Sequence, residues 1–370
     1  MRITGAVLER SGAPAPFAAS RPFTVGEIDL DPPAAGELLV RIEAAGVCHS
    51  DLSVVDGNRV RQTPMLLGHE AAGIVEQVGD GVTDVALGDR VVMTFLPRCG
   101  ACAGCAADGR LPCEIGTAAN NAGTLVGGGI RLHRSVGGVD QAVHHHLGVS
   151  AFASHAVVSR TSVVPVDADV PPDIAALLGC AVLTGGGAVI NAGRPEPAAP
   201  LIVVGLGGVG MAALLVARAL GHEVVGVDAV SAKLDLACEL GASAAFSPAD
   251  AAERGIRAPV VIEAAGSARA FETAFDLTSP GGTTVTAGLP APEARASISP
   301  LRLTAEARTI VGSYLGSAVP SRDIPRYVEL WRAGRLPLER LVSSHIDLEH
   351  LDEAMDRLAA GGELRQLITF

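Results

Sequence analysis

Four cysteines crowd into fifteen residues: Cys99, Cys102, Cys105 and Cys113. Four thiolates at this spacing suit a closed, tetrahedral Zn2+ site of the structural kind. An iron-sulfur cluster would favour a shorter final spacing and a proline after the last cysteine, whereas Glu114 stands there. Disulfides are the remaining alternative, although two-residue spacings are tight for pairing. The pattern therefore favours structural zinc.

A second set of possible metal ligands is spread over three segments, at Cys48, His69 and Cys180. Two thiols and one imidazole form a three-ligand zinc set, and a catalytic zinc keeps its fourth position open for substrate. Taken singly, each residue also has an ordinary role, because a lone cysteine is usually a small core residue. Cys238 has helical spacing with its apolar neighbours, and we predict that it lies in the core.

A glycine-rich turn follows a short β-branched run at residues 200–204 and carries Gly205, Gly207 and Gly210. The next residues predict a helix, and a second strand then ends at Asp228. Strand, turn, helix and acid are the context of a dinucleotide site, in which the helix N-terminus receives the pyrophosphate and the acid binds the ribose. A carboxylate at Asp228 would repel a 2'-phosphate, so the pattern favours NAD over NADP.

The composition narrows the class of protein. The chain has 370 residues, of which 48% are hydrophobic and 18% charged, as expected for a globular protein of two or three domains. The net charge is −12 with no cluster of Lys or Arg, which disfavours nucleic acids and anionic membranes and favours small-molecule partners. The N-terminus lacks the apolar segment of a signal peptide, so we expect a cytoplasmic protein.

The two halves of the chain have different patterns. Short strands separated by Gly, Pro and Asp turns, such as 37–43 and 74–78, predict a barrel-like β domain in the first half. Alternating strands and helices after residue 200 predict a doubly wound parallel sheet. The expected fold class is α/β plus β, with one domain formed by residues 1–182 and 316–370 and the other by residues 183–315.

These motifs, taken in order, resemble the zinc-dependent, medium-chain alcohol dehydrogenases. The likeness rests on G-H-E-x-x-G at 68–73, the two cysteine sets, Thr184 after Cys180, the glycine fingerprint and the closing residues 365–370. The long segment between Cys113 and Ser150 is similar in length to that of the dimeric, class III-related members. The resemblance implies a GroES-like catalytic domain, a Rossmann domain, two Zn2+ per chain, NAD and a homodimer.

The resemblance also implies roles for single residues. Around the metal, Ser50 would take the alcohol proton, Asp51 would orient His69 from behind, and Glu70 would lie near the zinc without being a fixed ligand. Toward the coenzyme, the resemblance adds four residues to the glycines and Asp228: His49, Thr184, Lys233 and Arg365. Arg365 would reach the pyrophosphate and Lys233 the adenosine ribose.

The sequence departs from the family pattern at several positions. Ser53 replaces a histidine that many relatives use to complete the proton relay, so the proton would leave through His49 or water. The similarity further places Phe95, His146 and Leu147 in the substrate pocket. An imidazole at 146, where relatives often have an aromatic hydrocarbon, would make the pocket wall more polar and favour a functionalised alcohol. Consecutive side chains of an extended segment face opposite sides, so His144, His145 and His146 are not expected to bind one ion.

The function that these features predict is hydride transfer between a primary or functionalised alcohol or aldehyde and NAD. Two alternatives stay open. One is a formaldehyde dehydrogenase that depends on a small thiol, for which glutathione is disfavoured because Thr117 stands where glutathione-dependent relatives have an arginine. The other is a catalytically silent dinucleotide-binding protein.

Overall fold

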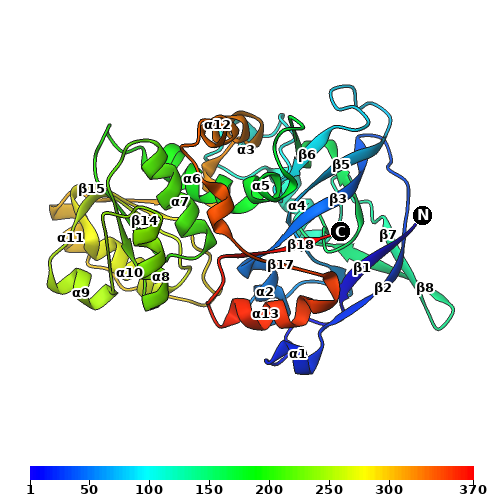
Figure 1. The fold of residues 1–370 in the computed structure, drawn as a ribbon, viewed down its shortest axis with the longest axis horizontal. Helices are drawn as coiled ribbons and strands as arrows, with labels where there is room; N and C mark the ends of the chain where they lie inside the picture. Colours follow the sequence, from blue (N-terminus) through cyan, green and yellow to red (C-terminus); the bar gives the residue numbers. More distant parts are fainter. The chain divides into compact units, whose positions relative to one another are not determined.

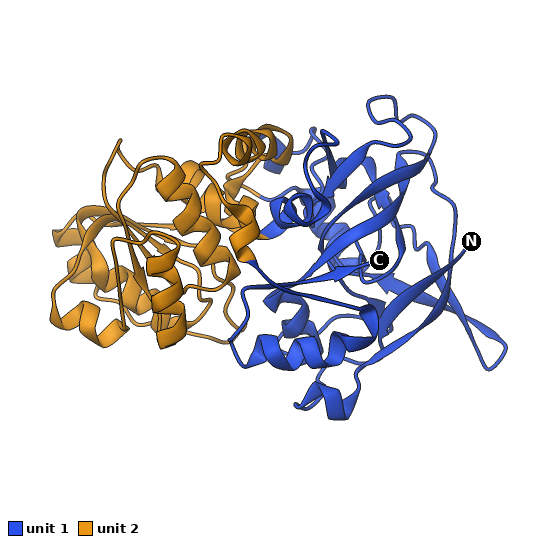
Figure 2. Cartoon of the chain, in the orientation of Figure 1, with its two compact units in different colours: residues 1–107, 112–180, 342–370 blue, residues 108–111, 181–341 orange.

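The computed structural model describes residues 1–370 and divides into two compact units (Figure 2). Unit 1 comprises Met1–Ala107, Pro112–Cys180 and Val342–Phe370, and unit 2 comprises Asp108–Leu111 and Ala181–Leu341. The first boundary lies within two residues of the expected one. The second does not: residues 316–341, which we assigned to the catalytic domain, belong to unit 2.

Unit 1 is the β-rich unit that the turn-separated strands predicted. Its strands form a closed barrel in the order β1-β2-β7-β8-β4 and a seven-stranded sheet in the order β10-β6-β5-β3-β18-β17, with β9 also paired to β3 (Figure 1). The strands are β1 (Arg2–Leu8), β2 (Phe23–Leu30), β3 (Glu37–Val47), β4 (Met65–Leu66), β5 (Glu70–Val78), β6 (Arg90–Met93), β7 (Leu132–Val136), β8 (Val139–His145), β9 (His155–Ser159), β10 (Val163–Val166), β17 (Val342–Ile346) and β18 (Arg365–Thr369).

The long strand β3 organises this unit. It pairs along most of its length with β5 and β9, and its last residues pair with β18 from the end of the chain. Its inward side chains, such as Leu38, Val40 and Ile42, join a core that also receives Ile368 of β18. The chain end therefore returns to the first unit, as the sequence predicted.

Short helices connect these strands and carry several site residues. The helical elements of unit 1 are α1 (Phe17–Ser20), α2 (His49–Val55), α3 (Ala103–Ala106), α4 (Glu114–Ala122), η1 (Arg160–Ser162), α5 (Pro172–Leu177), the π-helical η2 (Leu178–Val182), η6 (Leu348–His350) and α13 (Leu351–Ala359). The turn η2 runs across the boundary between the units after Cys180.

Unit 2 is built on a six-stranded parallel sheet in the order β13-β12-β11-β14-β15-β16. In chain order within the unit this is 3-2-1-4-5-6, the arrangement of a doubly wound dinucleotide-binding fold. The strands are β11 (Leu201–Val204), β12 (Val224–Val227), β13 (Ala244–Phe246), β14 (Ala258–Glu263), β15 (Thr278–Thr286) and β16 (Thr309–Gly312). The predicted Rossmann sheet is confirmed.

Helices separate the strands of unit 2 (Figure 1). They are α6 (Leu183–Gly187), the π-helical η3 (Ala188–Gly193), α7 (Gly208–Ala219), α8 (Ser231–Glu239), α9 (Pro248–Glu253), α10 (Ala268–Leu277), α11 (Pro300–Ala305), η4 (Tyr314–Ser317), α12 (Pro320–Arg332) and η5 (Leu338–Leu341). The continuous helical stretch Pro172–Gly193 is long and apolar enough to cross a membrane, but 89% of its 18-residue apolar window is buried inside the protein. Such burial is typical of a core helix.

Close backbone packing explains why residues 316–341 belong to unit 2. A Cβ on Gly187 of α6 would lie 2.2 Å from the carbonyl oxygen of Gly316, and a Cβ on Gly186 would lie 2.7 Å from the hydroxyl of Tyr327. The missing side chains of α6 thus make room for η4 and α12. The sequence showed the glycines, but not what approaches them.

The prediction for Cys238 was wrong, because this cysteine is exposed. Helix α8 buries Ala237 and is followed by the buried Leu240, three residues apart. Cys238 lies one residue outside this narrow buried face, which a nine-residue helix does not define well by spacing alone.

Candidate active site

Cys48 is positioned by the junction between β3 and α2. It is the N-terminal cap of α2, and the Asp51 side chain accepts a hydrogen bond from its backbone amide at 3.2 Å. This reciprocal arrangement of cap and third helical residue satisfies an amide that the helix leaves unpaired. The thiol is 5% exposed and Asp51 is fully buried. Local capping thus fixes both a metal-ligand candidate and the acid next to it.

His69 precedes β5 and is completely buried. The preceding Gly68 has a φ of +89°, and a Cβ there would lie 2.6 Å from the backbone nitrogen of Phe152. Glycine is therefore required where the chain turns into the site. Nδ1 of His69 lies 3.0 Å from Oδ1 of Asp51, which leaves Nε2 for a metal.

Cys180 lies in the π-helical turn η2, a local widening of the helix that often accompanies functional sites. Its Sγ lies 3.5 Å from Nε2 of His69, and the ligand atoms of Cys48, His69 and Cys180 are all within 4.8 Å of one another. The three predicted ligands therefore converge. A buried set of two sulfurs and one imidazole nitrogen fits zinc with an open fourth position.

Glu70 and Arg365 lie behind this set. Nε of Arg365 donates to Oε1 of Glu70 at 3.1 Å, and its Nη2 lies 3.7 Å from Sγ of Cys48. Burial raises the pKa of Glu70 to about 7, against the opposing charge of Arg365. Its second oxygen, Oε2, is buried without a partner, as expected of a carboxylate near a cation. The contact of Arg365 with the pyrophosphate stays a prediction.

The environment favours the charged forms of Cys48 and Asp51, whereas the neighbouring Cys48 raises the pKa of Cys180. The neighbouring Cys180 lowers the pKa of Cys48, with Arg365 acting in the same direction. Burial alone would raise the pKa of Asp51, but the charges and hydrogen bonds of His69 and His146 hold it below its usual range. A thiolate and a carboxylate are the forms that a zinc site and its supporting histidine require.

Two aromatic rings flank His69. Phe95 and His146 each lie with their ring centroids 5.5 Å from that of His69, at an interplanar angle of 86°. Nδ1 of His146 also lies 3.2 Å from Oδ1 of Asp51. The sequence comparison placed both residues at the substrate, and it gave no sign that His146 approaches Asp51.

The four-cysteine loop brings its thiols together as predicted. All four sulfurs lie within 4.8 Å of one another, with Cys99 to Cys105 and Cys102 to Cys113 each at 3.9 Å. A tetrahedron with Zn–S bonds of about 2.3 Å requires sulfurs about 3.8 Å apart. The cysteines form no disulfide, and backbone amides donate to the sulfurs of Cys102 and Cys113. The donor set fits structural zinc.

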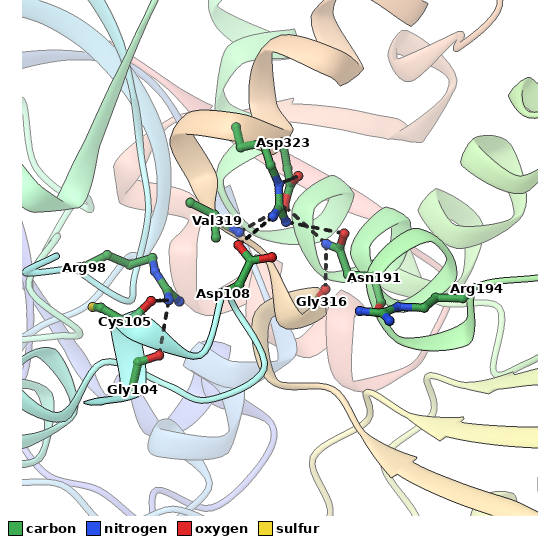
Figure 3. A network of polar contacts seen from close by, with 10 residues as sticks. Arg98, Gly104, Cys105, Asp108, Asn191, Arg194, Gly316, Val319 and Asp323 are labelled. Carbon is green, nitrogen blue, oxygen red and sulfur yellow. Dashed lines mark hydrogen bonds and ion pairs between the residues drawn. The ribbon is translucent and has the colours of Figure 1, made fainter. Parts of the chain in front are cut away.

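Polar contacts hold the cysteine loop at two places, near Cys105 and at Asp108 (Figure 3). Nη2 of Arg98 donates to the carbonyl oxygens of Gly104 and Cys105 at 3.4 Å each. The loop tip, Asp108–Leu111, is part of unit 2, where Nη1 of Arg322 donates to Asp108 at 2.8 Å. The segment between Cys105 and Cys113 is thus held by contacts of its own within unit 2.

The coenzyme fingerprint has the expected local structure in unit 2. Gly207 caps α7, and a Cβ built on it would meet no atom within 4 Å, whereas a Cβ on Gly210 would lie 1.8 Å from the carbonyl oxygen of Gly205. Asp228 accepts hydrogen bonds from the amides of Leu206 at 2.7 Å and Val230 at 2.9 Å. The open space over Gly207 and the free helix N-terminus fit a pyrophosphate.

The structure places the remaining predicted residues without testing their roles. His49 is exposed, and Ser50, Thr184 and Lys233 are buried or partly buried, in α2, α6 and α8 respectively. Ser53 donates its hydroxyl to the carbonyl of His49 at 2.8 Å, so it stabilises α2. His145 and His146 contact different partners, as the alternation of an extended segment predicted.

Comparison with known proteins assigns the family. The model described as alcohol dehydrogenase GroES-like domain matches residues 34–168, and the one described as zinc-binding dehydrogenase matches residues 208–332. NDMA-dependent alcohol dehydrogenase of Amycolatopsis methanolica is 37% identical over 100% of this chain and 99% of its own length. The chain belongs to the zinc-dependent medium-chain alcohol dehydrogenase family. A putative alcohol dehydrogenase D of Mycobacterium tuberculosis is likewise 37% identical, with 100% of both chains covered.

Solved structures agree with this assignment. An alcohol dehydrogenase zinc-binding domain protein from Burkholderia ambifaria has a TM-score of 0.91 at 32% identity, covering 100% of this chain and 99% of its own. Benzyl alcohol dehydrogenase from Acinetobacter calcoaceticus has a TM-score of 0.90 at 29% identity, with the same coverage. This medium-chain dehydrogenase is thus an enzyme of alcohol oxidoreduction, with zinc and a nucleotide cofactor and with small molecules as substrates.

Proposed function

We propose that the protein transfers hydride between a primary or functionalised alcohol and NAD, with one catalytic and one structural Zn2+ per chain. The observation that carries the proposal is the convergence of Cys48, His69 and Cys180, with Asp51 against Nδ1 of His69. When bound there, zinc supplies a Lewis acid that lowers the pKa of the alcohol hydroxyl.

The chain's own residues divide the remaining work. Asp51 fixes the tautomer and orientation of His69, and the paired charges of Glu70 and Arg365 support the Cys48 side of the site. We assign to the Ser50 hydroxyl, two residues after Cys48, the acceptance of the alcohol proton. Since Ser53 is engaged with the His49 carbonyl, the proton then leaves through His49 or water.

The coenzyme assignment rests on the end of β12. When bound, NAD supplies the nicotinamide that exchanges hydride with the substrate. Gly207 leaves space for the pyrophosphate, and Asp228 places a carboxylate where a ribose hydroxyl is expected and a 2'-phosphate is disfavoured. In this proposal Thr184, Lys233, Arg365 and His49 complete the coenzyme contacts.

A second candidate is an activity that passes reducing equivalents to an acceptor other than free NAD. It is favoured by the relative from Amycolatopsis methanolica, which is named as NDMA-dependent and is similar over the whole chain. Both candidates use the same zinc ligands. They differ in whether NADH accumulates in solution.

The deciding experiment measures initial rates with primary, aromatic and polar alcohols under four conditions: with NAD, with NADP, with NDMA and no added nucleotide, and with NAD plus a small thiol. Zinc-dependent NADH formation without thiol supports the first candidate. Turnover only with NDMA supports the second, and turnover only with thiol supports the thiol-dependent formaldehyde dehydrogenase.

Two controls make the experiment specific to the proposed metal site. Cys48→Ser should abolish turnover with every acceptor while the folded protein and the four-cysteine zinc remain. Retained activity in this variant would overturn the assigned catalytic metal site. One zinc ion per chain with silence under all conditions would favour the silent dinucleotide-binding protein, whereas two zinc ions with silence would point to a specialised substrate outside the panel.

The assembly and location of the protein stay proposals. We propose a homodimer in the cytoplasm, following the similarity in length to dimeric members of the family. Analytical ultracentrifugation at several protein concentrations checks the first point, and fractionation of the native cell checks the second.

A further inference from the structure

Oδ1 of Asp51 is crowded, because three nitrogen atoms lie within 3.2 Å of it. The backbone amide of Gly68 lies at 3.2 Å, Nδ1 of His69 at 3.0 Å and Nδ1 of His146 at 3.2 Å. The other oxygen, Oδ2, accepts only the backbone amide of Cys48, at 3.2 Å. A carboxylate oxygen has two lone pairs, and the Gly68 amide and Nδ1 of His69 engage both, so Nδ1 of His146 lies at ion-pair distance without a hydrogen bond of its own. Removing one of these nitrogen atoms should strengthen the contacts that Oδ1 keeps with the others.

The position of His146 beside Asp51 is fixed by its surroundings. Its side chain is 2% exposed, and its backbone amide donates to Oγ of Ser150 at 2.9 Å and to the carbonyl of Leu66 at 3.3 Å. Its ring also meets His69 edge to face. Its Nδ1 is buried and completes no hydrogen bond, and Oδ1 of Asp51, at 3.2 Å, is the charged atom that it faces. The imidazole therefore has one fixed polar contact, on the carboxylate that supports the zinc ligand.

We propose that His146 is a positioning residue that acts through Asp51: by sharing Oδ1 it limits the electron donation of Asp51 to His69 and so keeps a zinc ion at Nε2 more strongly Lewis acidic. The inference rests on the proposed catalytic zinc site. A carboxylate behind a ligating histidine raises the basicity of that ligand, so an additional donor on the same oxygen acts in the opposite direction.

The test compares His146→Phe with His146→Asn. Phenylalanine keeps a ring beside His69 but removes the nitrogen, whereas the asparagine amide places an N–H near the position of Nδ1. For His146→Phe we expect zinc to be released to a chelator more slowly, by up to about 10-fold, the lower end of what outer partners of metal ligands contribute. The visible spectrum of the Co2+-substituted protein should shift, and kcat should fall more than KM changes. His146→Asn should restore all three properties toward the wild type.

Several outcomes are decisive. Faster zinc release in His146→Phe would show that the ring only supports the fold and would overturn the inference, as would an unchanged Co2+ spectrum. His146→Gln, which moves the amide to the position of Nε2, replaces the Phe variant if that protein does not fold. In an Asp51→Asn background, His146→Phe should no longer change zinc release, because contacts that act through one group are not additive.

A matched control separates this inference from the proposed function. His144→Phe, two residues earlier and partly exposed, should leave zinc release and the Co2+ spectrum unchanged. A wild-type protein without metal at Cys48, His69 and Cys180 would overturn the catalytic zinc site and this inference together. If the wild-type protein holds that metal but the His146 variants match it in zinc release and in the Co2+ spectrum, this inference alone would be overturned.

Discussion

Oδ2 of Asp228 accepts a hydrogen bond from the backbone amide of Leu206 at 2.7 Å, so the acid at the end of β12 is tied to the glycine turn at the end of β11. The two strands are neighbours in register, with Val204 opposite Val227. The residue that should select the coenzyme therefore also shapes the turn that should bind its pyrophosphate.

This double role predicts different results for two substitutions. Asp228→Asn keeps an acceptor for Leu206 but loses the charge, so the preference for NAD over NADP should fall by about 10-fold, or about 1.4 kcal/mol. Asp228→Gly should relax the preference as well and in addition lower the free energy of unfolding by about 1–3 kcal/mol, because the buried amide of Leu206 loses its partner. Rates with both coenzymes and urea denaturation measure the two effects. An unchanged preference in both variants would show that the ribose contact lies elsewhere.

Substitution of two fingerprint glycines should have different effects, one on coenzyme binding and the other on folding. Gly207→Ala adds a methyl group to open space, so the free energy of unfolding should stay near that of the wild type while coenzyme affinity falls at least about 10-fold. Gly210→Ala would place its Cβ 1.8 Å from the Gly205 carbonyl oxygen and should destabilise unit 2 even without coenzyme. Calorimetric titration and thermal unfolding of both variants check this, and equal stability would contradict it.

Asp51 should control zinc retention. Asp51→Asn removes the charge behind His69, and we expect zinc to bind about 10–100-fold more weakly at the site of Cys48, His69 and Cys180. Chelator competition on the purified protein measures the loss. Asp56→Asn, at the other end of α2, is the matched control and should keep its zinc. Equal zinc release in both variants would mean that Asp51 only caps the helix.

Substitutions in the four-cysteine loop should lower the stability of the protein more than they lower its catalytic turnover. Cys102→Ser removes one of four converging sulfurs, so the variant should lose the structural zinc and unfold at lower temperature. Its remaining folded fraction should still turn over alcohol. Cys238→Ser is the matched control, because Cys238 is exposed and belongs to no cluster. Similar melting temperatures of Cys102→Ser and the wild type would argue against a structural metal in the loop.

Much of the site followed from the sequence, because short-range chemistry fixed it. The spacing of Cys99, Cys102 and Cys105 allows few geometries, and the glycine turn after a buried strand has one well-known use. The pairing of Asp51 with His69 was also implied by the family resemblance. These features depend on residue type and local backbone, which a sequence displays directly.

Tertiary structure alone decided the long-range contacts. Arg365 meets Glu70 across 295 residues, and His146 meets Asp51 through the return of a barrel strand. Residues 316–341 joined unit 2 because the glycines of α6 admit their backbone, and Cys238 faces outward because α8 is only weakly amphipathic. Spacing along the chain determines which ligands are available. Which buried charges share a partner depends on where distant strands and helices come to lie.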